Sequence, residues 1–211
     1  MLSLRKGGRF CVRLFSCKNT MKDIFDINIF KEIEIDAIVK KIKSKKRKCF
    51  SIEKGTRQID FMIDEIKKDE EYRFISFGAF SSICFIKFIS ERYGKIEELY
   101  ASTLRVGVKY IEMLSNLDID YACFMFGSIF NNGSEAYGYF EKFDDVCKKK
   151  GWEYIQAKNH SKIILIKTEK DNFVIETSSD LNENPKIEQF VLSNNKELFE
   201  WYKRFFEEMK K

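Results

Sequence analysis

Along residues 49–151, hydrophobic and polar positions alternate between two patterns. Short and nearly continuous apolar runs are followed by segments in which apolar residues recur every three or four positions. The first pattern is typical of strands that are covered on both faces, and the second of amphipathic helices. Strands that alternate with helices predict βαβ units and a largely parallel sheet. The predicted strands are 49–52, 72–80, 96–103 and 121–130, and the predicted helices are 56–68, 81–94, 107–117 and 137–151.

After residue 151 the pattern changes. Two β-rich runs, 152–168 and 172–180, are separated by only three residues, which is too few for a helix, so we expect an antiparallel hairpin. The last segment, 196–211, spaces its apolar residues as a helix does, and we expect it to pack on the sheet. We interpret these apolar residues as core rather than as a binding platform: Leu198, Trp201, Tyr202, Phe205 and Phe206.

The predicted fold class is therefore α/β, with a mixed, mainly parallel sheet flanked by helices and a C-terminal antiparallel hairpin. With 211 residues, 44% of them hydrophobic and 34% charged, the chain is neither disordered, collagen-like nor a disulfide scaffold. No apolar run approaches the roughly 20 residues of a membrane span. The N-terminus also lacks the apolar stretch of a signal peptide. We expect a cytoplasmic protein without a membrane partner.

Basic residues are concentrated near the N-terminus. Residues 1–48 contain 14 Lys and Arg against 5 Asp and Glu, whereas the rest of the chain contains 24 against 28. We therefore divide the chain into a basic N-terminal arm and helix, 1–48, with the helix predicted over 22–46, and an α/β domain, 49–211. The basic run fits nucleic acid or another polyanion, although it could also be a solvated helix end or linker. The candidate phosphate contacts are Lys40, Lys41, Lys43, Lys45, Lys46, Arg47 and Lys48.

The chain has one histidine, His160. It is the sole histidine candidate for acid–base chemistry at neutral pH. With one histidine and six cysteines that form no C-x-x-C pair, we expect no metal site and no cofactor. If residues 152–168 form a strand, His160 and Lys162 leave it on the same face. The hairpin then returns residues 177–180 beside them.

This grouping suits chemistry on a phosphate ester. An imidazole can attack phosphorus, while a lysine, a serine hydroxyl and backbone N–H groups of a turn stabilise the oxygens that gain charge. The alternative interpretation is a surface or structural histidine in an ordinary βαβ domain.

The sequence His160-Ser161-Lys162, followed by T-S-S-D-L at 177–181, resembles the H-x-K … G-S-x-N motif of the phospholipase D superfamily. It is similar to the single-motif members found in phages and mobile elements, and the order of elements over about 50–209 resembles one half of that fold. The resemblance implies a metal-independent phosphodiesterase, favours a nuclease, and suggests that Glu188 hydrogen-bonds to His160. The implied catalytic residues are His160, Lys162, Ser178, Asp180 and Glu188.

The resemblance also implies a homodimer. The family reaction runs through a phosphohistidine on one histidine, while a second histidine protonates the leaving group. This chain has one histidine, so His160 of a second copy would meet the first across a two-fold axis.

Three positions depart from the family pattern. Lys167 stands where the family has aspartate, Thr177 where it has glycine, and Asp180 where it has asparagine. An ionised carboxylate is only an acceptor and repels a phosphodiester, unless it instead orients His160. The departures motivate a second hypothesis, a catalytically weakened phospholipase D-like module that binds nucleic acid.

Overall fold

The computed structural model describes residues 47–52, 59, 62–77, 80–127, 134–183 and 186–211. The chain divides into two units, Met1–Ile42 and Lys43–Lys211, and all the described residues belong to the second. The predicted helix at 22–46 lies outside the described residues. The predicted domain boundary after residue 48 stays a prediction, although Arg47 and Lys48 are the first residues of a strand.

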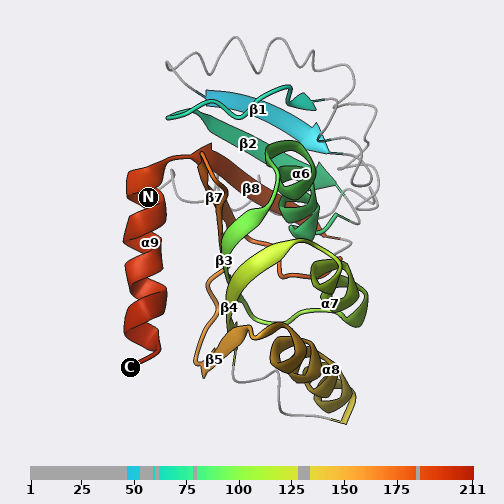
Figure 1. Ribbon diagram of the computed structural model, residues 1–211. Helices are drawn as coiled ribbons and strands as arrows, with labels where there is room; N and C mark the ends of the chain where they lie inside the picture. The colour runs from blue at the N-terminus through green and yellow to red at the C-terminus, as the bar shows by residue number, and fades with distance from the viewer. Residues whose placement is uncertain (1–46, 53–58, 60–61, 78–79, 128–133, 184–185) are drawn as a thin grey trace, which may run out of the picture. The chain divides into compact units, whose positions relative to one another are not determined.

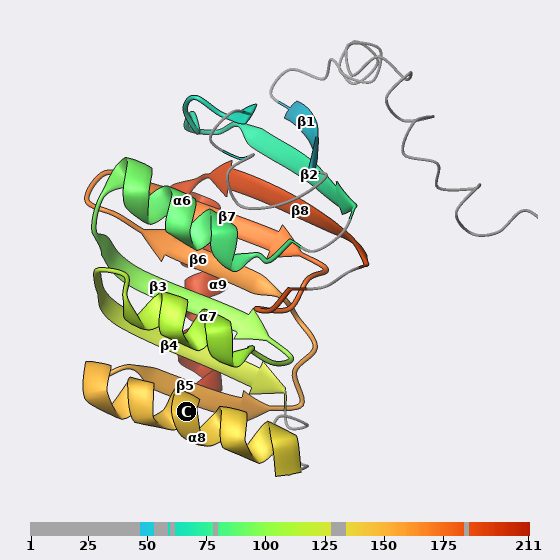
Figure 2. The ribbon, with the colours of Figure 1, turned by 90° about the vertical axis from the view of Figure 1, so that its right-hand side faces the viewer.

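The described residues form one eight-stranded sheet with the strand order β1-β2-β8-β7-β6-β3-β4-β5. Helices α6, α7 and α8 cover one face of the sheet and α9 covers the other (Figures 1 and 2). The elements are β1 (Arg47–Ile52), β2 (Glu71–Phe77), α6 (Ile83–Tyr93), β3 (Ile96–Thr103), α7 (Val108–Ser115), β4 (Ile119–Gly127), α8 (Ser134–Lys150), β5 (Glu153–Ala157), β6 (Ile163–Lys167), β7 (Asn172–Thr177), β8 (Ile187–Asn194) and α9 (Lys196–Met209).

The α/β class is confirmed, but the expectation of a mainly parallel sheet is wrong. Strand pairs β1–β2, β3–β4 and β4–β5 are parallel, whereas β2–β8, β8–β7, β7–β6 and β6–β3 are antiparallel. The difference arises because β6, β7 and β8 follow one another without crossover helices and occupy the centre of the sheet. The parallel βα units therefore lie on both sides of an antiparallel middle.

Several predicted elements appear at their expected places. Strand β3 has the predicted bounds, and α6 begins after Ser82 and ends at Gly94, whose φ of 90° favours glycine. The predicted helix at 56–68 is wrong in its second half. The N–H of Ile63 donates to the carbonyl of Ile59 at 3.0 Å, as in a helical turn, but Lys68 already pairs with Asn194 as a β-bridge.

Strand β8 was not predicted, and it is the strand that joins the two parts of the sheet. Its side chains alternate at first between exposed and buried, and it pairs with β2 on one side and β7 on the other. The buried ring of Phe190 packs edge-to-face against Phe80, with centroids 5.2 Å apart, and at a tilt against Phe85 at 5.3 Å. The strand thus anchors the core beneath α6.

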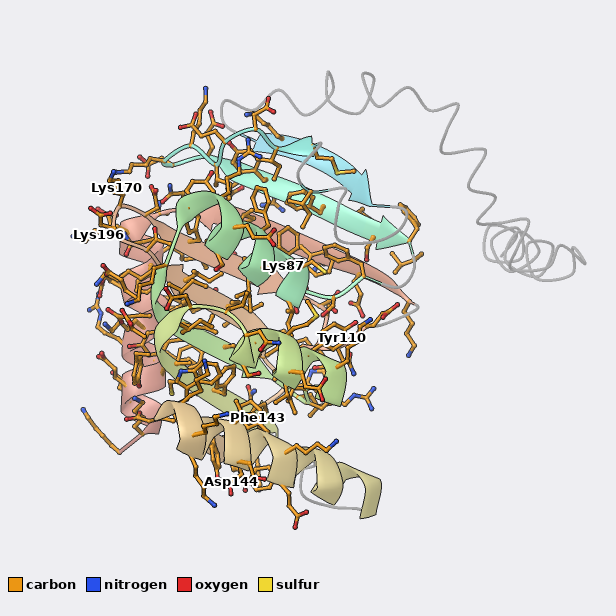
Figure 3. The ribbon with its side chains drawn as sticks, turned by 45° about the vertical axis from the view of Figure 1, so that its right-hand side comes forward. Lys87, Tyr110, Phe143, Asp144, Lys170 and Lys196 are labelled. Carbon is orange, nitrogen blue, oxygen red and sulfur yellow. The ribbon has the colours of Figure 1, made fainter. Side chains whose placement is uncertain are left out.

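Aromatic side chains fill the core on both faces of the sheet. On the side of α8, Phe143 turns toward the sheet while Asp144 lies on the outer side of the helix (Figure 3). The Phe143 ring packs edge-to-face against the rings of Phe124 and Phe126, with centroid distances of 5.0 and 4.7 Å. On the opposite side, Phe199 and Phe206 of α9 are fully buried.

The expectation that every aromatic residue of the last helix is core is wrong at two positions. Trp201 is 60% exposed and Phe205 is 36% exposed, whereas Phe206 is fully buried. These two side chains therefore lie on a flank of α9 that the sheet leaves exposed.

Within the ranges that the structure describes, no helix is both long and apolar enough to cross a membrane.

Truncating Phe190 tests the central place of β8. We expect Phe190→Ala to lower the free energy of unfolding by about 3–5 kcal/mol, because it leaves a cavity between two aromatic rings. Ile187→Ala on the same strand is the matched control, since Ile187 is 48% exposed and its loss changes stability by less than about 1 kcal/mol. Urea unfolding at one protein concentration measures both variants. Equal effects of the two variants would contradict the strand's placement.

Candidate active site

The site lies at the edge of the sheet where the parallel strands β3 and β4 end. Three loops meet there, one after β3, one between β5 and β6, and one after β7. Val106 forms a β-bridge with Leu181, and the N–H of Thr177 donates to the carbonyl of Lys162 at 3.1 Å. Carboxyl ends of parallel strands are the common place for ligand binding in α/β sheets.

His160 and Lys162 do not lie on a strand, and this part of the prediction is wrong. The run 152–168 is split into β5 and β6, and residues 158–162 are irregular. The break is required because β5 pairs with β4, while β6 pairs with β3 in the opposite direction. The chain must cross the end of the sheet between them, and it carries the His-Ser-Lys sequence as it does so.

The two residues nevertheless meet. Lys162 Nζ lies 3.4 Å from His160 Nδ1 and donates to the backbone carbonyl of His160 at 3.0 Å. His160 is exposed, whereas the side chain of Lys162 is only 8% exposed. The lysine thus presents a charge from a nearly enclosed position beneath an accessible imidazole.

The Lys162 contact bears on the tautomer of the imidazole. An ammonium group is only a donor, so a hydrogen bond from Lys162 to Nδ1 requires the neutral tautomer that carries its proton on Nε2. A protonated Nε2 has no lone pair for attack on phosphorus. An anion that takes over Lys162 would release Nδ1, and the alternative tautomer would then make Nε2 nucleophilic.

Asp180 gathers donors from two of the three loops. Its Oδ1 accepts from the N–H of Leu104 at 3.0 Å and lies 3.5 Å from Lys162 Nζ, while its Oδ2 lies 3.7 Å from Arg105 Nε. The hydroxyl of Thr103 lies 3.3 Å from Oδ1. With its side chain 12% exposed, Asp180 forms a nearly buried ion pair with Lys162. Its described charge partners are thus Lys162 and Arg105 rather than His160.

Ser178 and Glu188 form a hydrogen-bonded pair. The hydroxyl of Ser178 donates to the Glu188 carboxylate and accepts from the N–H of Gln189 at 3.1 Å. Glu188 is buried on β8 and comes to the site because β8 runs beside β7. The structure therefore brings Glu188 to Ser178, and its role as the partner of His160 stays a prediction.

Asn159 and Ser102 were missed by the sequence analysis. Asn159 Oδ1 accepts from the backbone N–H of Ser161 at 3.0 Å and from its hydroxyl at 2.7 Å. Its Nδ2 donates to Ser102 Oγ at 2.9 Å and to the carbonyl of Met125 at 3.3 Å. Asn159 thus fixes the His-Ser-Lys loop to the ends of β3 and β4. Polar residues at the ends of apolar strands, as in Ser102-Thr103 of β3, were the available signal.

A glycine makes room for this anchor. A Cβ on Gly127, the last residue of β4, would come within 2.9 Å of the Asn159 carbonyl and 2.4 Å of Leu104 Cδ1. A larger residue would therefore push against two of the three loops, the one after β3 and the one between β5 and β6.

Most of the predicted phosphate contacts lie outside the described residues, namely Lys40, Lys41, Lys43, Lys45 and Lys46. Arg47 and Lys48 belong to β1. Lys48 Nζ lies 3.3 Å from a Glu70 carboxylate oxygen and 4.9 Å from the centre of the Tyr72 ring. Its charge is thus partly neutralised within the sheet.

The cysteines that the structure describes are buried. Cys84, Cys123 and Cys147 are free, and burial raises the pKa of the Cys84 and Cys123 thiols to about 11. Such thiols are poor nucleophiles near neutral pH. Among the described residues, no group of three His, Cys, Asp or Glu side chains is arranged to hold a metal ion.

No protein-family model matches the sequence, and no curated protein matches it. Similar solved structures include Nuc from Salmonella typhimurium, a phospholipase D family member, with 12% identity and a TM-score of 0.47 over 66% of this chain and 94% of that one. Polyphosphate kinase from Porphyromonas gingivalis aligns with 11% identity and a TM-score of 0.50, over 67% of this chain and 26% of that one.

A mutant of yeast tyrosyl-DNA phosphodiesterase 1 aligns with 12% identity and a TM-score of 0.36, over 47% of this chain and 25% of that one. The aligned regions thus make up about a quarter of the kinase and of the yeast enzyme. The likeness to polyphosphate kinase concerns the fold alone.

Removing the Asn159 side chain tests whether it positions the loop. We expect Asn159→Ala to destabilise the protein by about 1–3 kcal/mol, because buried partners lose their hydrogen bonds. The backbone N–H of Ser161 should exchange with solvent at least roughly tenfold faster. Lys158→Ala, at the exposed neighbouring position, is the control. Unchanged exchange at Ser161 in Asn159→Ala would remove the positioning role.

Proposed function

We propose that this chain is a metal-independent phosphodiesterase, specifically a nuclease, that works as a homodimer through a phosphohistidine intermediate. The observation that carries the proposal is the position of Lys162. Its nearly enclosed Nζ lies 3.4 Å from Nδ1 of His160, the one histidine of the chain, and 3.5 Å from Oδ1 of Asp180, which follows β7. A cation there attracts the non-bridging oxygens of a phosphodiester and brings phosphorus beside the imidazole.

In the first step, a ring nitrogen of His160 attacks phosphorus. A P–N bond forms, the P–O bond to the leaving group breaks, and the leaving oxygen takes a proton from the protonated His160 of the second copy. In the second step, that neutral histidine removes a proton from water, the water oxygen attacks phosphorus, and the P–N bond breaks. Lys162 stabilises the charged oxygens, and Ser178 adds a donor once its hydroxyl turns away from Glu188.

The substrate proposed is nucleic acid. Arg105 and Lys109 are exposed beside the loop that follows β3, at the same edge as His160. Together with the basic run at Lys40–Lys48, they offer phosphate contacts that carry no base specificity. We place no DNA or RNA preference on these contacts, because lysine reads phosphate as a point charge.

A second candidate function is nucleic-acid binding without cleavage. Asp180 favours it, because its carboxylate occupies a position beside Lys162 that a bound phosphate would need. Two anions compete for one cation there, so binding a phosphodiester requires the Lys162–Asp180 pair to open. The two candidates differ in whether P–O bonds break.

Hydrolysis in the presence of EDTA tests the enzymatic proposal. We expect the full chain to cleave a model phosphodiester and DNA or RNA, and His160→Ala to lose at least about 1000-fold in rate. Lys170→Ala, an exposed lysine in the β6–β7 turn, is the matched control and should keep full activity. Equal rates for wild type and His160→Ala, or hydrolysis by neither, would remove the catalytic claim. Retained nucleic-acid binding in that case would favour the second candidate.

Replacing Asp180 by asparagine tests the competition at Lys162. Asp180→Asn keeps the shape and one acceptor but removes the negative charge, so we expect inorganic phosphate to bind roughly tenfold more tightly. Any hydrolysis should rise with it at low substrate concentration. Isothermal titration calorimetry with inorganic phosphate measures the affinity. Unchanged phosphate affinity in Asp180→Asn would show that the anion does not bind at Lys162.

A further inference from the structure

We infer that the outward face of α9 is the surface on which two copies of this chain pair. Trp201, Phe205 and Met209 follow one another at intervals of four residues and are 60%, 36% and 41% exposed. They are three of the five large hydrophobic side chains that are exposed in the described part of the chain. Residues at this spacing form one stripe along a helix, here about 12 Å long.

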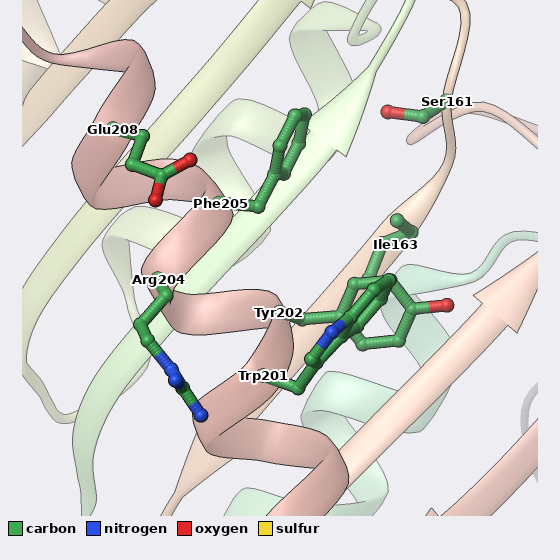
Figure 4. A pocket seen from close by; sticks show the side chains of 7 residues that line it. All are labelled: Ser161, Ile163, Trp201, Tyr202, Arg204, Phe205 and Glu208. Carbon is green, nitrogen blue, oxygen red and sulfur yellow. The ribbon is translucent and has the colours of Figure 1, made fainter.

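The stripe continues into a pocket next to the candidate active site. The pocket has a volume of about 440 Å³ and is bounded by α9, by the start of β6 and by the loop before it. Figure 4 shows Trp201, Tyr202 and Phe205 projecting from α9 on the side of Ile163 and Ser161. Ser161 lies between His160 and Lys162 in the chain, so the apolar surface reaches the loop that carries both of them.

Charged residues on this face are complementary to a second copy of the same helix. Arg204 and Glu208 also line the pocket, and neither has an ion-pair partner among the residues that the structure describes. At about 100° per residue, both lie on the same flank of Phe205. If two α9 helices pack antiparallel about a two-fold axis at Phe205, Arg204 of each copy comes beside Glu208 of the other, with an axial offset of about 3 Å.

A second copy fits this face better than nucleic acid does. Helix α9 contains four glutamates against three basic residues, and one of these, Lys203, is paired with Glu98, so the helix offers phosphate groups no net positive charge. The stripe is also longer than one nucleotide base, whereas a second helix of the same length can cover all of it. Stable dimers bury about 800 Å² on each partner, so the loops around Ser161 would join the helices in the contact.

The consequence for His160 rests on the proposed function. Pairing through this face brings the loops at Ser161 from both copies to one interface. A site that needs two histidines, but has one in each chain, would then be completed at that interface.

Sedimentation velocity of the full chain over a range of concentrations tests the surface. We expect the wild type to dimerise and Phe205→Glu to weaken dimerisation at least tenfold, with unchanged circular dichroism. Ile75→Glu is the matched control, because Ile75 is similarly exposed but lies on β2, away from α9. A monomeric wild type, a dimer that Phe205→Glu leaves intact, or equal weakening by Ile75→Glu would overturn the inference.

A charge exchange between copies separates pairing across the interface from effects within one helix. Arg204→Glu and Glu208→Arg should each be monomeric alone, because like charges then face each other twice. Mixed together they should form a heterodimer, because the variant with two acidic side chains at these positions then faces the variant with two arginines. Failure of the mixture to associate would overturn the antiparallel arrangement, since pairing within one helix cannot produce association on mixing.

The measurement of oligomeric state and the hydrolysis assay test the two proposals independently. A dimer through α9 without phosphodiesterase activity would retain this inference and contradict the proposed function. Activity in a monomer that does not decline on dilution would contradict both the α9 interface and the shared pair of histidines.

Discussion

The carboxylate of Asp180 holds the candidate site together from within. It accepts from the backbone of Leu104 and faces the cationic groups of Lys162 and Arg105, so the loop after β3 and the loop before β6 are both tied to the end of β7. A nearly buried carboxylate is tolerated only when such partners surround it. Removing one partner leaves an uncompensated charge. The Lys162–Asp180 pair therefore stabilises the arrangement of the loops, and under the proposed function it also competes with a phosphate for the lysine.

The same lysine links Asp180 to His160. Lys162 Nζ lies 3.5 Å from Asp180 Oδ1 and 3.4 Å from His160 Nδ1, so under the proposed function a phosphodiester drawn to this lysine would compete for both contacts. Beside it, the hydroxyl of Ser178 donates to the carboxylate of Glu188, which comes from β8.

The sequence pattern predicted the local elements well and the long-range pairing poorly. Strand β3, helix α6 and the return of Thr177 beside Lys162 follow from periodicity and loop length, which depend on neighbouring residues. Strand β8 pairs with β2, more than 100 residues away, and its first residues read as a polar tail leading into a helix. The break at 158–162 was visible as five polar residues within an apolar run, but its cause, the reversal between β5 and β6, is a property of the whole sheet. Asn159 escaped notice for the same reason, since its partners come from β3 and β4.

Helix α9 shows how one apolar pattern can serve two contacts. Phe199 and Phe206 pack under the sheet, and the hydroxyl of Tyr202 donates to Glu176 on β7, so the inner face of the helix is fixed. The aromatic residues at the intervening positions face outward, and periodicity alone cannot separate the two faces when both are apolar. An exposed apolar stripe lowers solubility unless another surface covers it, so it is unfavourable in a monomer. If a second copy covers it, the helix that completes the core of each chain also sets the distance between the two histidine loops, and activity would then depend on protein concentration through the same residues that hold the dimer.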